Sequence, residues 1–279
     1  MPLHDLVSPW AAAAEADDAP QARALFRARH AALLERLRRQ RAPHDAELAL
    51  ERDPVVLRRL AHRAADPEWQ QRLRDTMARA ASLGADVAAT VTLLSGDGTG
   101  DAAEPIPARS PIAALFVERG DDATLTVALI RSLAAITRWC APDSRSPVRA
   151  VVTDDWDRWE CARRVPLAEW AYLEGVGLHL AAELFPEFEP TQLLGISRGA
   201  LHRLRERERL LRTLFLADLE QPSLGAVLRW LAPGAPPSAR TVGNVVIPPG
   251  AGRYLAWRMS AERVARVGTR EAIRMSASS

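Results

Sequence analysis

The sequence predicts an α+β protein that is mostly helical, with a small sheet placed ahead of a deeply buried helix. Residues 85–94 (ADVAATVTLL) and 111–118 (PIAALFVE) are short apolar runs between turn signals, a pattern typical of strands. Residues 123–139 have helical spacing, and their polar positions recur every seven residues at Thr124, Arg131 and Arg138. Because the rest of that helix surface is apolar, we expect this helix to be mostly buried.

The other elements follow from apolar periodicity and from Pro and Gly breaks. Residues 1–18 are Ala-rich and acidic without periodicity, so we expect them to be poorly ordered. We assign residues 1–65 to an N-terminal helical extension and residues 66–279 to one main domain, because no linker or repeat divides the chain. The remaining expected elements are helices at 21–41, 54–84 (with a new turn at Asp66), 166–186, 190–219, 223–231 and 251–267, a short strand at 148–152, and irregular segments at 95–104 and 153–164.

The composition excludes several classes of function. All 37 basic residues are arginine, so mechanisms that need a Schiff-base lysine, a lysine base or a phosphate-loop lysine are excluded. The formal net charge of +2 predicts neither a nucleic-acid partner nor a membrane surface. No apolar run is long enough for a membrane span, and the first residues lack a secretory signal pattern. We expect a soluble cytoplasmic protein, and the abundance of Ala and Arg suggests a bacterial genome rich in GC.

Glu174 is the most informative residue of the helix expected at 166–186. At about 100° per residue, it lies in the middle of an apolar stripe. The other polar residues of the helix, Glu169, His179 and Glu183, gather on the opposite side. A carboxylate in an apolar setting is costly unless it is neutralised, paired or bound to a metal. Two interpretations stay open, a structural Glu paired with an arginine and an inherited functional position.

The order of these motifs resembles the gluzincin metallopeptidases, and specifically a predicted zinc-dependent peptidase family known as a domain of unknown function. In that family a first helix carries HExxH, whose two His bind zinc while its Glu activates water. A second helix carries Glu-Gly-x-Ala, whose Glu is the third zinc ligand; Glu174-Gly175-Val176-Gly177 is similar to it. The family ends in Gly-Tyr-Tyr-x-Gly-Tyr-Arg, and residues 252–258 (GRYLAWR) look like an altered version. The resemblance implies a zincin-like fold for residues 66–279.

The sequence departs from this family at the residues that carry the chemistry. Aligned on the family pattern, Leu129 and Leu133 stand at the two His positions, and Ile130 stands at the catalytic Glu. Hydrocarbon side chains cannot bind zinc, and one carboxylate cannot hold it alone. We therefore expect no metal, no cofactor and no zinc peptidase activity. We also expect Leu129, Ile130 and Leu133 to fill the space left by the metal in front of Glu174, which then takes an arginine partner or carries a raised pKa.

The candidate site is built around that glutamate. Arg258 is our candidate partner for Glu174, although an ordinary pair with Glu262 explains it equally well. Tyr254 could donate a hydrogen bond into the same pocket, or it could be a plain core residue. The segment 153–164 could rim the former substrate cleft, or it could be a solvated loop. The candidate catalytic residues are Glu174, Tyr254 and Arg258, and the candidate binding residues are Asp154, Trp156, Trp159 and His179.

Three functions fit these observations. The first is a metal-free zincin-like pseudoenzyme that has lost peptidase activity and uses its scaffold and cleft to bind a small-molecule ligand or a protein partner. The second is a repurposed non-metal enzyme acting on a small or carrier-bound substrate in a specialised bacterial biosynthetic pathway. Glu174 would then be the general acid or base, with Tyr254 and Arg258 orienting the substrate. The third is a structural subunit of a complex.

Overall fold

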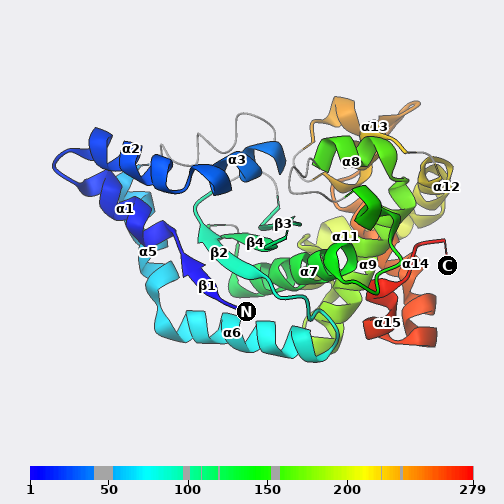
Figure 1. The fold of residues 1–279 in the computed structure, drawn as a ribbon. Coiled ribbons are helices and arrows are strands. Elements are labelled where there is room, and N and C mark those ends of the chain that lie inside the picture. The colour runs from blue at the N-terminus through cyan, green and yellow to red at the C-terminus, as the bar shows by residue number, and fades with distance from the viewer. Residues whose placement is uncertain are drawn as a thin grey trace.

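The computed structural model describes residues 1–40, 53–96, 101–107, 109–118, 120–151, 158–220, 222–232 and 235–278 (Figure 1). It is a mixed α+β protein dominated by helices, as the sequence predicts. In Figure 1 the N-terminal helices lie to the left of the small sheet, above it and below it, and the helices of the C-terminal half lie to its right. No helix in the described ranges is both long and apolar enough to cross a bilayer.

The sheet has four strands in the order β1-β2-β4-β3, namely β1 (Leu3–Asp5), β2 (Thr90–Leu94), β3 (Ala103–Ile106) and β4 (Ile112–Phe116). The strands β2 and β4 confirm the two predicted strands, and each is shorter than its apolar run. They pair in parallel with Thr90 opposite Ile112, and β3 is antiparallel to β4. The segment that we expected to be irregular up to residue 104 therefore contributes the start of β3, because pairing with β4 orders it.

The first eighteen residues form β1 and the helix α1 (Val7–Glu15) rather than the unstructured segment that their composition predicts. Strand β1 pairs in parallel with β2, and Leu3 lies opposite Val91. In α1, Trp10 is 1% exposed and packs with Phe26 and Leu57. A long-range strand partner and one aromatic anchor thus order a segment that has no periodicity of its own.

Most of the predicted helices are present. Residues 21–41 and 54–84 correspond to four helices, and the new turn expected at Asp66 is the break between the last two, where its carboxylate caps the second. Residues 190–219 form three shorter helices. These elements are α2 (Ala19–Arg29), α3 (Ala31–Gln40), α5 (Pro54–Ala65), α6 (Pro67–Ser82), α10 (Pro190–Leu194), α11 (Arg198–Glu206), α12 (Glu208–Leu219) and α13 (Leu224–Leu231).

Three long helices form the centre of the molecule: α7 (Asp122–Cys140), α9 (Leu167–Leu184) and α14 (Ala251–Val267). Helix α7 packs on β3 and β4 with one side and on α9 with another, and α9 in turn packs on α14. Asp121 caps α7 through the backbone N–H of Thr124, and almost all of α7 is buried, as predicted. The boundaries of α14 agree with the prediction of a final helix at 251–267.

Two glycines allow this close packing. A Cβ on Gly175 would clash with the carbonyl oxygen of Ala256 on α14, and a Cβ on Gly177 would lie 3.2 Å from the Cα of Arg131 on α7. The absence of a side chain at Gly175 therefore permits the close approach of α9 to α14, and its absence at Gly177 relieves crowding between α9 and α7. The Glu-Gly-Val-Gly run thus has a packing role that motif comparison alone does not reveal.

Two further segments differ from expectation. The short strand predicted at 148–152 is wrong, because residues 148–151 belong to the 3₁₀ helix η2 (Pro147–Val151), where Pro147 fixes a helical φ and removes a strand donor. Part of the expected irregular segment 153–164 forms α8 (Arg158–Arg164). After α13, the chain forms η3 (Pro237–Arg240) and a hairpin of β5 (Thr241–Val242) and β6 (Val245–Val246).

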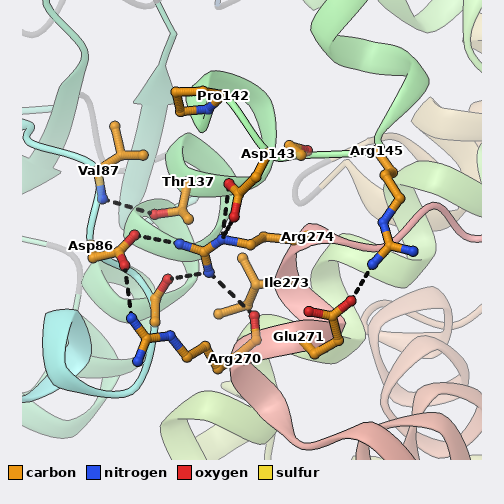
Figure 2. Close-up of polar contacts among 12 residues, drawn as sticks. Asp86, Val87, Thr137, Pro142, Asp143, Arg145, Arg270, Glu271, Ile273 and Arg274 are labelled. Carbon is orange, nitrogen blue, oxygen red and sulfur yellow. Dashed lines mark hydrogen bonds and ion pairs between the residues drawn. The ribbon is translucent and has the colours of Figure 1, made fainter.

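The chain ends in α15 (Thr269–Arg274), which the sequence analysis did not anticipate. Figure 2 shows how one arginine attaches it to the rest of the protein. The guanidinium of Arg274 lies 2.6 Å from Asp86 and 2.9 Å from Asp143, and it also donates to the carbonyl oxygen of Gly84 at 3.0 Å. These contacts join the C-terminal end to the loops before β2 and after α7.

Candidate functional site

Glu174 belongs to a group of four charged residues, which we call the Glu174 network: Asp101, Arg131, Glu174 and Arg253. Arg131 on α7 pairs with Glu174 on α9 and lies 3.0 Å from Asp101, just before β3. Arg253 on α14 lies 2.8 Å from Asp101 and 3.3 Å from Glu174. The four side chains are between 10% and 18% exposed, so the network is largely removed from solvent.

The charges of this network cancel, and each carboxylate has two guanidinium partners. Burial alone would raise the pKa of Asp101, but Arg131 and Arg253 outweigh it and hold that pKa well below its ordinary value. Burial alone would lower the pKa of Arg131, but Asp101 and Glu174 outweigh it and raise that pKa. Asp101 and Arg131 therefore stay charged at neutral pH, which suits a fixed electrostatic framework rather than proton transfer.

A cavity of about 40 Å³ lies beside the network. An ordered water needs about 10–15 Å³, so this cavity has room for a few waters and is too small for a peptide. From α7 it is lined by Ala128, Arg131, Ser132, Ala135 and Trp139. The other lining residues are Asp101, Ala103, Glu104, Pro105, Trp170, Leu173 and Glu174.

The prediction that Leu129 and Leu133 face Glu174 is wrong. Arg131 contacts Glu174, and at 3.6 residues per turn each leucine lies about 160° from Arg131 around α7. Leu129, Ile130 and Leu133 are all buried in the main core, at 0%, 0% and 1% exposure, and none of the three lines the cavity. Arg131, which stands between the two leucines in the sequence, is the residue that faces Glu174. The motif alignment had instead predicted that the leucines face it.

The expectation that Glu174 takes an arginine partner is confirmed, but the predicted partner is wrong. Arg258 is 60% exposed and lies 3.6 Å from Glu208 on α12. It follows Arg253 by five positions, which places it about 140° further around α14. Because Arg253 is the residue that faces α9, Arg258 necessarily faces away from Glu174.

Tyr254, like Arg258, contacts Glu208 and is not part of the Glu174 network. Its hydroxyl donates a hydrogen bond to Glu208 at 2.5 Å. Burial, followed by the hydrogen bond to Glu208 and the charge of that residue, raises the pKa of Tyr254 to about 12. The three residues proposed as catalytic therefore do not converge: Glu174 faces α7, while Tyr254 and Arg258 meet Glu208.

Of the candidate binding residues, His179 has a clear structural contact. Its Nε2 lies 2.9 Å from the carbonyl oxygen of Trp257, so the ring links α9 to α14. Burial lowers the pKa of His179, although this hydrogen bond opposes the shift. Asp154 and Trp156 lie outside the described residues, as does the side chain of Trp159.

The residues of this region do not fit a zinc ion. Zinc sites in proteins use several His, Cys or carboxylate ligands. The described part of the chain contains no group of three such residues that could hold a metal. Three carboxylates line the cavity, those of Asp101, Glu104 and Glu174, and arginines already pair with Asp101 and Glu174.

Comparison with known proteins finds no matching family model, no similar curated protein and no similar solved structure. Function must therefore be argued from the residues and their geometry.

Sequence reasoning missed three members of the network: Asp101, Arg131 and Arg253. A usable signal existed for Arg131, because a charged residue every seven positions on an otherwise apolar helix needs a partner on a neighbouring element. Arg253 stands next to Tyr254 in the C-terminal motif, and only the rotation of α14 distinguishes it from Arg258. Asp101 gave no local signal.

Proposed function

We propose that this protein is a metal-free, zincin-like binding protein without peptidase activity, whose scaffold serves to bind a ligand or a protein partner. The observation that carries the proposal is the Glu174 network. The carboxylate that corresponds to the third zinc ligand of the resembled family is neutralised by two guanidinium groups, those of Arg131 and Arg253. A cation is thus present at this position, but protein side chains supply it.

The composition of α7 supports the loss of the metal whichever alignment is chosen. Residues 122–140 contain no histidine, so no register of this helix can present two of them one turn apart. The face toward Glu174 offers Ala128 and Ser132 at the spacing that the HExxH histidines would have. Neither residue can replace an imidazole ligand.

A binding function is better supported than an enzymatic function in which Glu174 is the catalytic residue. The carboxylate of Glu174 is already paired with the guanidinium groups of Arg131 and Arg253, whereas a general acid or base must be free to contact the substrate. The residues that would orient a substrate in the enzymatic alternative, Tyr254 and Arg258, contact Glu208 instead. That alternative therefore lacks its assembled site.

The first test is the metal content of the purified full-length chain. We expect far less than one zinc per chain by mass spectrometry, and no change in melting temperature after chelation. About one zinc per chain, removable by a chelator with loss of stability, would contradict the proposal.

A second test asks whether the scaffold is zincin-like. The variant Ala128→His/Arg131→Ala/Ser132→His places two imidazoles one turn apart on the face opposite Glu174. We expect it to gain one zinc site, whereas the matched control Arg131→Ala should gain none. If the triple variant folds and binds no more zinc than the control, the likeness to zincins fails.

A further inference from the structure

A second and larger cavity has Arg253 in its wall. Its volume is about 230 Å³, against about 40 Å³ at Glu174. Four segments enclose it: the end of α10, the end of α13, the segment around η3, and the start of α14. The lining residues are Leu194, Gly195, Ile196, Arg229, Trp230, Leu231, Ala232, Ala235, Arg240, Pro248, Pro249, Gly250 and Arg253.

The charged residues of this wall are all arginines: Arg229, Arg240 and Arg253. Arg253 is balanced by the Glu174 network behind it. Arg229 is balanced by Asp218, which does not line the cavity; Nη1 of Arg229 lies 2.6 Å from Oδ2 of Asp218. Each of these two guanidinium groups is therefore held in place by an acid while its arginine forms part of the wall.

Arg240 differs, because backbone oxygens and not a carboxylate hold it. Its Nε donates to the carbonyl oxygen of Ala235 at 2.9 Å, and its Nη1 donates to the carbonyl oxygen of Ile247. No carboxylate of the described chain pairs with it. The Nε of Arg229 is also buried without a hydrogen-bond partner among the described residues. Counting the described residues, the cavity thus has one positive charge that no carboxylate pairs with and one buried donor without a hydrogen-bond partner.

The start of α14 adds to this positive potential. Gly250, with φ of 79°, caps the helix without a side-chain hydrogen bond, and it lines one side of the cavity together with Pro248, Pro249 and Arg253. The N-terminus of a long helix carries a partial positive charge and favours an anion. A Cβ on Gly252 would clash with the carbonyl oxygen of Trp230, so the start of α14 is pressed firmly against the end of α13.

The rest of the wall is apolar, with Leu194, Ile196, Trp230, Leu231 and two prolines. A hydrated inorganic ion would gain nothing from such surfaces, whereas an organic molecule buries its apolar body there. A guanidinium is matched by the two oxygens of a carboxylate. One uncompensated positive charge calls for one negative charge.

We propose that this cavity is a binding site for a small organic monocarboxylate, with Arg240 taking the carboxylate and the apolar wall taking the body of the molecule. This inference rests on the proposed binding function and names its ligand class. Arg253 connects the site to the Glu174 network, which holds one wall of the cavity in a fixed position.

Calorimetric titration of the full chain with benzoate, benzamide and phenyl phosphate tests the assignment. We expect saturable binding of benzoate and at least about tenfold weaker binding of neutral benzamide and of doubly charged phenyl phosphate. Arg240→Gln should weaken benzoate binding by at least about tenfold. The matched control Arg203→Gln, on the exposed side of α11, should bind benzoate as the wild type does.

A second variant guards against misfolding of Arg240→Gln, whose arginine also supports the backbone. Ile196→Trp fills the cavity and leaves every charge in place, so it should abolish benzoate binding in a protein with an unchanged circular dichroism spectrum. Three results would overturn the proposal: no benzoate binding up to about 10 mM, equal binding of benzamide or tighter binding of phenyl phosphate, or undiminished benzoate binding by Ile196→Trp. Zinc content, measured separately, decides the proposed function independently of this outcome.

Discussion

Two ion pairs join the same two helices, and they differ in what surrounds them. Near the end of α7, Arg138 pairs with Glu169 at the start of α9. About two helical turns earlier on α7, Arg131 pairs with Glu174. The pairs run in opposite order along the two helices, so α7 and α9 are antiparallel. The first pair is 1% and 4% exposed, and the second is 10% and 18% exposed.

The bonding capacity of Glu169 is used by the protein itself. Besides Arg138, its carboxylate accepts from the hydroxyl and backbone groups of Ser276 and Ala277 at 2.6 Å each. Glu174 instead shares its arginines with Asp101 and borders a cavity. The Arg138–Glu169 pair is therefore a buried structural contact, because the C-terminal segment packs on it. The Arg131–Glu174 pair borders a cavity instead.

The largest expected effect comes from breaking the fully buried pair. Arg138→Met leaves Glu169 charged, buried and without its guanidinium partner, which should lower the free energy of unfolding by about 3–5 kcal/mol. Urea denaturation followed by circular dichroism measures this. Arg163→Met, whose side chain is 58% exposed, is the matched control and should change stability by less than about 0.5 kcal/mol. A loss for Arg138→Met as small as the control's would remove the distinction between the two pairs.

Arg131→Met should cost less, about 1–3 kcal/mol, because Glu174 keeps Arg253 as a partner and retains some contact with solvent. The same denaturation experiment applies. Adding Arg253→Met removes both cations from two carboxylates, so the double variant should lose more stability than the two single losses combined. Simple additivity would mean that the four residues do not act as one network.

Acid should weaken the Glu174 network through Asp101. The folded-state pKa of Asp101 lies below the value of about 3.9 in the unfolded chain, so the unfolded state binds more protons in acid. Its stabilising contribution is complete above about pH 5 and is lost as the pH falls through about 4 toward the lower folded-state pKa. Unfolding free energies of wild type and Asp101→Asn should therefore converge between about pH 6 and pH 3. A constant difference over that range would contradict the assignment, and exposed Asp75→Asn provides the baseline.

The smallest effect is expected outside both pairs, at Arg258. Its guanidinium is 60% exposed and 3.6 Å from Glu208, so Arg258→Gln should change the unfolding free energy by less than about 0.5 kcal/mol. Thermal and urea unfolding would show this directly. A loss comparable to that of Arg131→Met would restore Arg258 as a structural partner of the central helices.

Helices with strong periodicity were predictable from the sequence, and so was the need of Glu174 for an arginine. The run between Pro166 and Pro186 gave α9, and residues 251–267 gave α14. Strands β1 and β3 were missed because their order comes from pairing with β2 and β4. Helix α15 was missed because its order rests largely on Arg274 and its distant carboxylates.

The sequence by itself determined that a carboxylate would stand on an apolar face of α9, that a charged residue would recur along α7, and that α7 would offer no metal ligands of the HExxH kind. Only the tertiary structure decided which arginines meet that carboxylate. A rotation of about 100° per residue separates Arg131 from its leucine neighbours and Arg253 from Arg258. That rotation is set by how α7, α9 and α14 pack, including the close approaches at Gly175 and Gly177. Local spacing fixes which residues share a face, whereas packing between helices fixes what that face meets.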